Sequence, residues 1–257
     1  MGITSFILKF AAPIPHMEHY DHYLFIGPHP DDIEIGAGGT VAKLTSMGKQ
    51  VSFLICLDGR FGLEHAPEGT SPEALSRIRK QECMDAAKVL GVSNVRFLDL
   101  SDGGLYAKEA LFDGIAKMVG EIKPEVLFAP DPDTGSECHQ DHLNVGNAVK
   151  QLAFFAPFEE IMRAHGAETA SVKALALYMT AKPNRYVSVN KRLLQKQQEA
   201  ILCHKSQYPK DSADLHSLYT YLKLRSVDFG IRSFHGRAEG FRVLGRTHMH
   251  CLPEAGR

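Results

Sequence analysis

The feature that most constrains this chain is the alternation of strand-like and helix-like segments over its first 155 residues. Short apolar or β-branched runs, typical of strands covered on both faces, alternate with longer stretches whose apolar residues recur at helical spacing. The strand-like runs lie at residues 23–26, 51–57, 95–98 and 126–129, and the helix-like stretches at residues 40–47, 72–90, 111–122 and 143–155. This alternation predicts βαβ units and an α/β fold with a mostly parallel sheet between helices.

The second half of the chain is less regular. It contains two predicted strands and two predicted helices, which lie at residues 174–179, 186–189, 191–205 and 215–228. No internal repeat, low-complexity tract or linker divides the sequence. We therefore expect a single α/β domain over residues 1–257, with a core of about residues 20–155 and a C-terminal elaboration of about residues 156–257.

Composition excludes several classes of protein. Lysine and arginine number 29 against 30 aspartate and glutamate residues, a balance that argues against a bulk nucleic-acid binder. No apolar run of about 18 residues is present, and the N-terminal residues lack a secretory h-region, so we expect no membrane span and a cytoplasmic protein. The five cysteines are odd in number and form no C-x-x-C motif, which is typical of a reduced protein.

The loop after the first predicted strand carries the first candidate site. In open parallel sheets, ligands bind beyond the carboxyl ends of the strands. Here the sequence reads G-P-H-P-D-D, with His29, Asp31 and Asp32 within four positions. Adjacent carboxylates repel each other unless a cation lies nearby. Imidazole nitrogen together with carboxylate oxygen suits Zn²⁺ or a similar divalent transition metal.

Two other interpretations of this loop remain open from the residues alone. The glycines at positions 36, 38 and 39 could belong to a nucleotide-binding loop, but their spacing is not G-x-G-x-x-G and acidic residues precede them. The aspartates could also simply cap the following helix. We retain a non-catalytic metal- or nucleotide-binding Rossmann module as an alternative function.

The loop after the fourth predicted strand carries a second cluster, H-x-D-H, with His139, Asp141 and His142 at a loop-to-helix junction. Two histidines three positions apart on a helical turn can face one point. Asp141 is placed to accept a hydrogen bond from an imidazole and fix its tautomer. Either cluster alone could be a helix cap, but two such clusters after predicted parallel strands favour one shared site.

In these motifs the sequence resembles the LmbE-like, or PIG-L type, N-acetylglucosamine deacetylases, which pair P-H-P-D-D with a later H-x-D-H. Further matches are R-x-x-E at residues 79–82, D-G-G-L at 102–105, H-x-S-Q at 204–207 and A-E-G-F-R at 238–242. The later motifs are most similar to the branch of diacetylchitobiose and N-acetylglucosamine deacetylases. The resemblance implies a Rossmann-like fold with a varied C-terminal part, and a trimer or hexamer.

The resemblance also implies roles for individual residues. His29, Asp32 and His142 would bind zinc. Asp31 would be the general base, and His139 would be the second acid–base group and would stabilise the oxyanion. These five residues, with Asp141 as their catalytic support, form the predicted active site.

Two further residues are predicted to bind substrate. Arg79 would reach the sugar side of the site by the same resemblance, although on a helix it could instead pair with Glu82. His250, with His248 beside it near the chain end, could complete a pocket, including that of a neighbouring subunit. His204 could be a further pocket residue, or could favour the negative C-terminus of the predicted helix over residues 191–205, near whose end it lies.

The predicted function is zinc-dependent hydrolysis of the N-acetyl group of a small N-acetylglucosamine-type sugar, diacetylchitobiose among them. Two imidazoles and one carboxylate leave zinc an open position for a water molecule. A second enzymatic interpretation is a zinc amidase that acts on another N-acyl compound or a thiol–sugar conjugate. Charged and neutral substrates would require different charges near the pocket, which the sequence alone does not locate.

Overall fold

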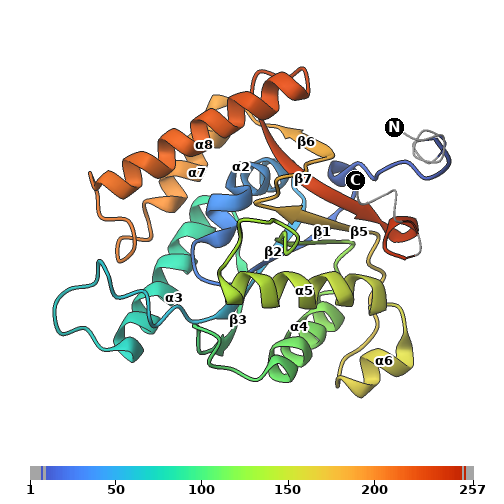
Figure 1. The fold of residues 1–257 in the computed structure, drawn as a ribbon, viewed down its shortest axis with the longest axis horizontal. Coiled ribbons are helices and arrows are strands. Elements are labelled where there is room, and N and C mark those ends of the chain that lie inside the picture. The colour runs from blue at the N-terminus through green and yellow to red at the C-terminus, as the bar shows by residue number, and fades with distance from the viewer. Residues whose placement is uncertain (1–6, 8–9, 251, 253–257) are drawn as a thin grey trace.

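Seven strands form one sheet, in the order β3-β2-β1-β4-β5-β7-β6, in the computed structural model, which describes residues 7, 10–250 and 252 (Figure 1). The strands are β1 (His22–Gly27), β2 (Gln50–Leu57), β3 (Asn94–Leu100), β4 (Val126–Pro130), β5 (Ala174–Tyr178), β6 (Arg185–Ser188) and β7 (Ala238–Gly245). The helices are α2 (Asp32–Ser46), α3 (Pro72–Val89), α4 (Lys108–Ile122), α5 (Gln140–Phe155), α6 (Glu159–Ala164), α7 (Lys191–Ile201) and α8 (Ala213–Arg232), with short 3-10 segments η1 (Met17–His19) and η2 (Arg246–His248). The predicted α/β class, with a mostly parallel sheet, is confirmed.

The strand order places a topological switch between β1 and β4. From β1 the chain proceeds outward to β2 and β3, then returns to the other side of β1 as β4, and all four of these strands are parallel. Strand β5 continues the parallel array, whereas β7 is antiparallel to both β5 and β6. At such a switch point the two flanking loops diverge and leave a crevice beyond the strand ends.

Helices cover both faces of the sheet, which explains why its central strands are apolar along their whole length. Along β1, Tyr23 and Phe25 point into the core beneath α2 and α3. Leu24 and Ile26 point into the opposite core, which α4 and α5 cover. Helix α7 packs against α2, and α8 packs against β7 (Figure 1). The C-terminal part of the chain thus adds strands to the same sheet and a helical layer behind α2.

The structure differs from the sequence expectation in four elements. Helix α2 begins at Asp32 and not at residue 40. The prediction started too late because the first half of this helix is rich in glycine, which is intrinsically unfavourable in a helix by about 1 kcal/mol per residue. Helix α7 ends at Ile201, before the predicted residue 205. Strand β7 and helix α6 were not predicted, since neither segment shows a clear period in the sequence.

Two expectations about the whole chain concern cysteines and membranes. The cysteines at positions 56, 83, 138 and 203 are free thiols, and Cys251 lies outside the described residues. In the part of the chain that the structure describes, no helix is both long enough and apolar enough to cross a bilayer.

Candidate active site

The loops after β1 and β4 bring the two predicted clusters together at the switch point. The first loop carries His29 and ends at Asp32, the first residue of α2. The second loop ends at His139, the N-cap of α5, so that His142 lies in the first turn of that helix. The ring centroids of His29 and His142 are 5.5 Å apart. The loops after two neighbouring strands, β1 and β4, therefore share one site.

Asp32 lies between two histidines, and these three side chains form a group that could hold a metal ion. Asp32 Oδ2 is 3.3 Å from His29 Nδ1, and Asp32 Oδ1 is 3.3 Å from His142 Nε2. Burial opposes ionisation of Asp32, but the imidazoles of His142 and His29 outweigh it and hold the pKa of this carboxyl well below its usual range. The two nitrogens and the carboxylate fit the donor set of a zinc site with an open position.

Each of these imidazoles has a second carboxylate at its other nitrogen. Asp141 Oδ2 is 3.1 Å from His29 Nε2, and Glu137 Oε2 is 3.2 Å from His142 Nδ1. A carboxylate in this position accepts the outer N–H, which fixes the tautomer and makes the inner nitrogen a stronger ligand. The arrangement thus directs His29 Nδ1 and His142 Nε2 toward Asp32.

A second group, formed by His29, His139 and Asp141, also has possible ligand atoms within reach of one another. Here, however, the carboxylate is already engaged, because Asp141 accepts hydrogen bonds from Gly103 N at 2.7 Å and Gly104 N at 2.9 Å. Burial acts against ionisation, but the bonds from His29 and the glycine amides lower the pKa of Asp141 to about 2. The group around Asp32 is therefore the better candidate for a metal position.

Asp31, the predicted general base, precedes α2 and has a φ of 124°. A non-glycine residue in this region is strained, and proteins retain such strain mainly at functional sites. Its Oδ2 is 3.1 Å from Arg79 Nη2. Burial raises the pKa of Asp31 to about 6, although the Arg79 guanidinium opposes this rise. A carboxylate with a pKa near the working pH is suited to accept a proton and return it.

Arg79 is buried and holds the loops around the base. Its Nη1 donates to Gly59 O at 3.0 Å, and its Nη2 donates to Pro30 O at 2.8 Å. It does not pair with Glu82, because the Glu82 carboxylate accepts hydrogen bonds from the backbone and hydroxyl of Ser206. The structure places Arg79 against Asp31, and its contact with a sugar stays a prediction.

His139 lies beside the metal group with 52% of its side chain exposed. Its ring stacks on that of His142, with 4.9 Å between the centroids. His139 Nδ1 accepts the N–H of Asp141 at 3.3 Å, so the proton of the neutral ring lies on Nε2. Burial and the neighbouring His29 lower the pKa of His139, which favours this neutral form. His139 therefore presents an N–H donor at the rim of the site.

Comparisons with known proteins show the family of this chain. Residues 24–153 match the family model described as PIG-L: GlcNAc-PI de-N-acetylase. A diacetylchitobiose deacetylase from Thermococcus kodakarensis is 31% identical over 235 residues, which cover 90% of this chain and 86% of that protein. The chain belongs to the PIG-L family. The resemblance inferred from P-H-P-D-D and H-x-D-H is thus confirmed.

Solved structures share the fold of this chain. An N,N'-diacetylchitobiose deacetylase from Pyrococcus horikoshii, complexed with its inhibitor MPG, matches with a TM-score of 0.86 and 29% identity, over 96% of this chain and 93% of that chain. A 4-carboxy-2-hydroxymuconate hydratase from Pseudomonas putida shares the fold with a TM-score of 0.74 at 18% identity, over 87% and 96% of the two chains. Because this fold also carries a hydratase, the activity must be argued from the site.

Two side chains that orient the site had no role assigned from the PIG-L motifs. Glu137 contacts His142 as described above, and Tyr106 Oη donates to Asp141 Oδ1 at 3.1 Å while accepting from Asn144 Nδ2 at 2.9 Å. Tyr106 directly follows the D-G-G-L motif, and Glu137 precedes His142 by five positions. Position next to a motif was the only signal for either residue, and it does not distinguish them from other polar loop residues.

His204 of the H-x-S-Q motif lies in the core and not at a helix terminus. Its Nε2 is 3.5 Å from Glu34 Oε1, and both side chains are fully buried. Burial acts to lower the pKa of His204, but Glu34 outweighs it and raises this pKa. Helix α7 ends at Ile201, three residues before His204. His204 therefore pairs with Glu34 in the core and does not stabilise the C-terminal dipole of α7.

His250 is not brought to the metal group within one chain. Strand β7 runs antiparallel to β5 and pairs Gly245 with Ala174, so the chain leaves β7 at the amino edge of the sheet, opposite the crevice. There the His250 ring packs on Phe154 at 5.2 Å between centroids, and His248 Nε2 lies 2.8 Å from a backbone carbonyl. Any contact of His250 with substrate would require a neighbouring copy.

Proposed function

We propose that this chain is a zinc-dependent hydrolase that removes the N-acetyl group from an N-acetylglucosamine-type sugar and releases acetate and a free amine. One observation carries the proposal. Beside the His29, Asp32 and His142 group, a further buried carboxylate, Asp31, is kept off the metal position by its pairing with Arg79. A site that only binds metal has no use for such a group, whereas a hydrolase needs a base there.

The chain's residues divide the chemical work. Zinc, when bound, would polarise the acetamide carbonyl and make an attacking water more acidic. Asp31 accepts a proton from that water. His139 donates its Nε2–H to the carbonyl oxygen as negative charge develops there. Asp31 then returns its proton to the nitrogen of the leaving amine, which completes the hydrolysis without a net change in the enzyme.

The charges near the site favour a neutral sugar over an anionic conjugate. Two arginines lie in or against the loop after β2, and both are already paired. Arg60 Nε donates to Asp58 Oδ2 at 2.8 Å, and Arg79 is paired with Asp31. A phosphate or carboxylate on the substrate would compete for these pairs, while the hydroxyls of an acetylated mono- or disaccharide would not.

An acetate-release assay tests the function. The substrates are N-acetylglucosamine, diacetylchitobiose, a negatively charged N-acetylglucosamine conjugate and a simple N-acyl amino acid, each with and without chelator. We expect release from the neutral sugars, its loss with chelator and its recovery with Zn²⁺. Release only from the amino acid would favour the amidase interpretation, and no release from any substrate would contradict the proposal.

We also propose a homo-oligomer, a trimer or hexamer, in a reducing cytoplasmic setting. The free thiols support the setting. The assembly is inferred from the family resemblance, and His250, at the far edge of the sheet, could reach a site only in a second copy. Light scattering measures the number of subunits. If His250 serves a neighbour, mixing subunits with His250→Ala and Asp31→Asn will restore part of the activity that each lacks.

A further inference from the structure

The middle of α2 contains three glycines, at positions 36, 38 and 39, that lie against side chains from three other elements. A Cβ atom at Gly36 would collide with the ring of Tyr178, one at Gly38 would lie 2.8 Å from Gln197 Cγ, and one at Gly39 would lie 2.9 Å from Glu239 Oε1. Such distances leave no room for a larger residue. The glycines therefore reflect close packing of side chains on a helix, and not a phosphate-binding loop.

Glu239, at the start of β7, binds the backbone of this helix from one side. Its Oε1 accepts the N–H of Gly39 at 2.9 Å, and its Oε2 accepts both the N–H and the hydroxyl of Thr40 at 2.6 Å. The carboxylate is buried, and burial raises the pKa of Glu239 against the opposing effect of these donors. A buried carboxylate is costly for folding, so its presence here calls for a function.

Gln197, from α7, binds the same helix with the opposite polarity. Its Nε2 donates to Glu34 O at 2.9 Å and to Ile35 O at 3.3 Å. In a regular α-helix those two carbonyls accept from the amides four residues later. Gln197 thus supplies a donor and Glu239 an acceptor within consecutive turns of α2.

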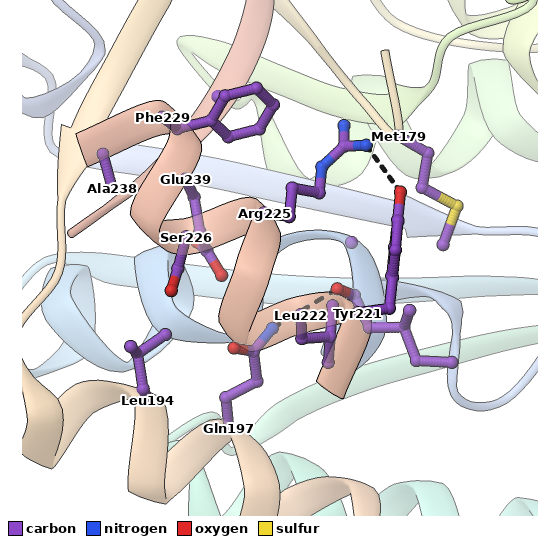
Figure 2. A pocket seen from close by; sticks show the side chains of 13 residues that line it. Met179, Leu194, Gln197, Tyr221, Leu222, Arg225, Ser226, Phe229, Ala238 and Glu239 are labelled. Carbon is purple, nitrogen blue, oxygen red and sulfur yellow. Dashed lines mark hydrogen bonds between the residues drawn. The ribbon is translucent and has the colours of Figure 1, made fainter. Parts of the chain in front are cut away.

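Figure 2 shows Gln197 and Glu239 extending from their separate elements beside a narrow cavity, with Leu222 and Ser226 of α8 nearby. The cavity measures about 40 Å³, and none of the metal-group residues lines it. This space admits water molecules and excludes a sugar. The role of Gln197 and Glu239 is therefore explained by their hydrogen bonds to the backbone of α2, and not by a ligand in the cavity.

We propose that Glu239 and Gln197 are positioning residues for the catalytic site, an inference that rests on the proposed function. The turn that they hold directly follows Asp31 and Asp32, and Ile35 N donates to Asp31 O at 3.0 Å. Fixing this turn fixes the base and one metal ligand relative to His142 on α5. Small displacements of such groups weaken metal binding and slow the reaction.

Two variants test the proposal with one matched control. Glu239→Gln places an amide donor opposite one of the donors on α2, and Gln197→Met removes the donor while retaining the shape of the side chain. Asn184→Leu is the control, because Asn184 also binds backbone, donating to Val243 O at 3.1 Å and accepting from Val243 N at 2.7 Å, but on β7.

The readouts are the melting temperature, the Zn²⁺ dissociation constant of the chelator-treated protein, and kcat and KM measured well below melting. We expect Glu239→Gln and Gln197→Met to weaken Zn²⁺ binding and lower kcat about tenfold or more, with KM within about twofold. Asn184→Leu should lower the melting temperature and leave the other values unchanged. If Glu239→Gln does not fold, Gln197→Met decides alone.

Zinc affinity and kcat within about twofold of the parent protein in the folded variants, or equal losses in Asn184→Leu, would overturn the proposal. The metal titration needs no substrate. Should the parent protein release no acetate, weakened Zn²⁺ binding in the two variants would still support positioning of Asp32, so the two proposals can fail separately.

Discussion

The part of the chain up to α5 and the part after it contribute to the same site in different ways. The first part supplies the three residues of the proposed metal position, His29, Asp32 and His142, from loops at the carboxyl ends of β1 and β4. The second part supplies buried contacts to α2 from behind, through Gln197, His204 and Glu239. Chemistry is thus concentrated in two short loops, whereas the support behind α2 comes from the distant end of the chain.

The largest effect that tests this comparison is loss of a proposed metal ligand from the first part. His29→Ala removes Nδ1 from the group around Asp32, and also leaves Asp141 without its imidazole partner. We expect elemental analysis to find almost no bound zinc, with acetate release falling to background. His165→Ala, a histidine paired with Asp113 on α4, is the control and should retain both. Full zinc occupancy in His29→Ala would show that the ligand set is wrong.

The next effect separates chemistry from metal binding. Asp31→Asn should retain zinc and lower kcat by about 10²–10⁴-fold, because the amide cannot accept the proton of water. Burial raises the pKa of Asp31 to about 6, so its ionisation at neutral pH costs folding free energy. The variant should therefore unfold at the same or a higher denaturant concentration. Asp21→Asn, at the exposed Asp21, is the control, and substantial turnover in Asp31→Asn would remove this residue from the mechanism.

The same division explains what the sequence could predict. His29, Asp32, Asp141 and His142 lie within short motifs after recognisable strands, so their convergence followed from the parallel topology. The contact between Thr40 and Glu239 joins residues 199 positions apart, and β7, which carries Glu239, has no clear period. Local patterns do not encode which distant side chain binds a helix backbone, and for this reason α2 was predicted to start too late.

An intermediate effect concerns the role of His139 in the first part. If it acts as a neutral donor through Nε2, His139→Gln should retain part of the stabilisation, with a loss of kcat of about tenfold. His139→Ala should lose about 10²–10³-fold, the typical contribution of one oxyanion donor. Both variants should bind zinc normally. Equal losses in Gln and Ala would instead indicate that His139 transfers a proton.

The smallest effect concerns the second part and appears in stability. Burial raises the pKa of Glu239 above its ordinary value of 4.5. At a pH below 4.5 the carboxyl is therefore protonated in both the folded and the unfolded chain, and its ionisation costs no stability. As the pH rises through the folded pKa, the unfolded chain has already released this proton, and the contribution of Glu239 to stability declines. The unfolding free energy of the parent protein relative to Glu239→Gln should therefore fall as the pH rises above about 4.5 in urea titrations with chelator.

Glu168→Gln is the control of opposite sign, because the hydrogen bond from Lys123 lowers the pKa of the exposed Glu168. The pair of Glu168 with Lys123 stabilises the folded chain above the ordinary pKa of Glu168 and is lost as the pH falls. The unfolding free energy of the parent protein relative to Glu168→Gln should therefore increase as the pH rises. A parent advantage over Glu239→Gln that also grows with pH would mean that the ionised carboxylate stabilises α2 by more than its burial costs. The contact with Gly39 and Thr40 would then contribute to folding as well as to positioning, and the two parts of the chain would differ less than the structure indicates.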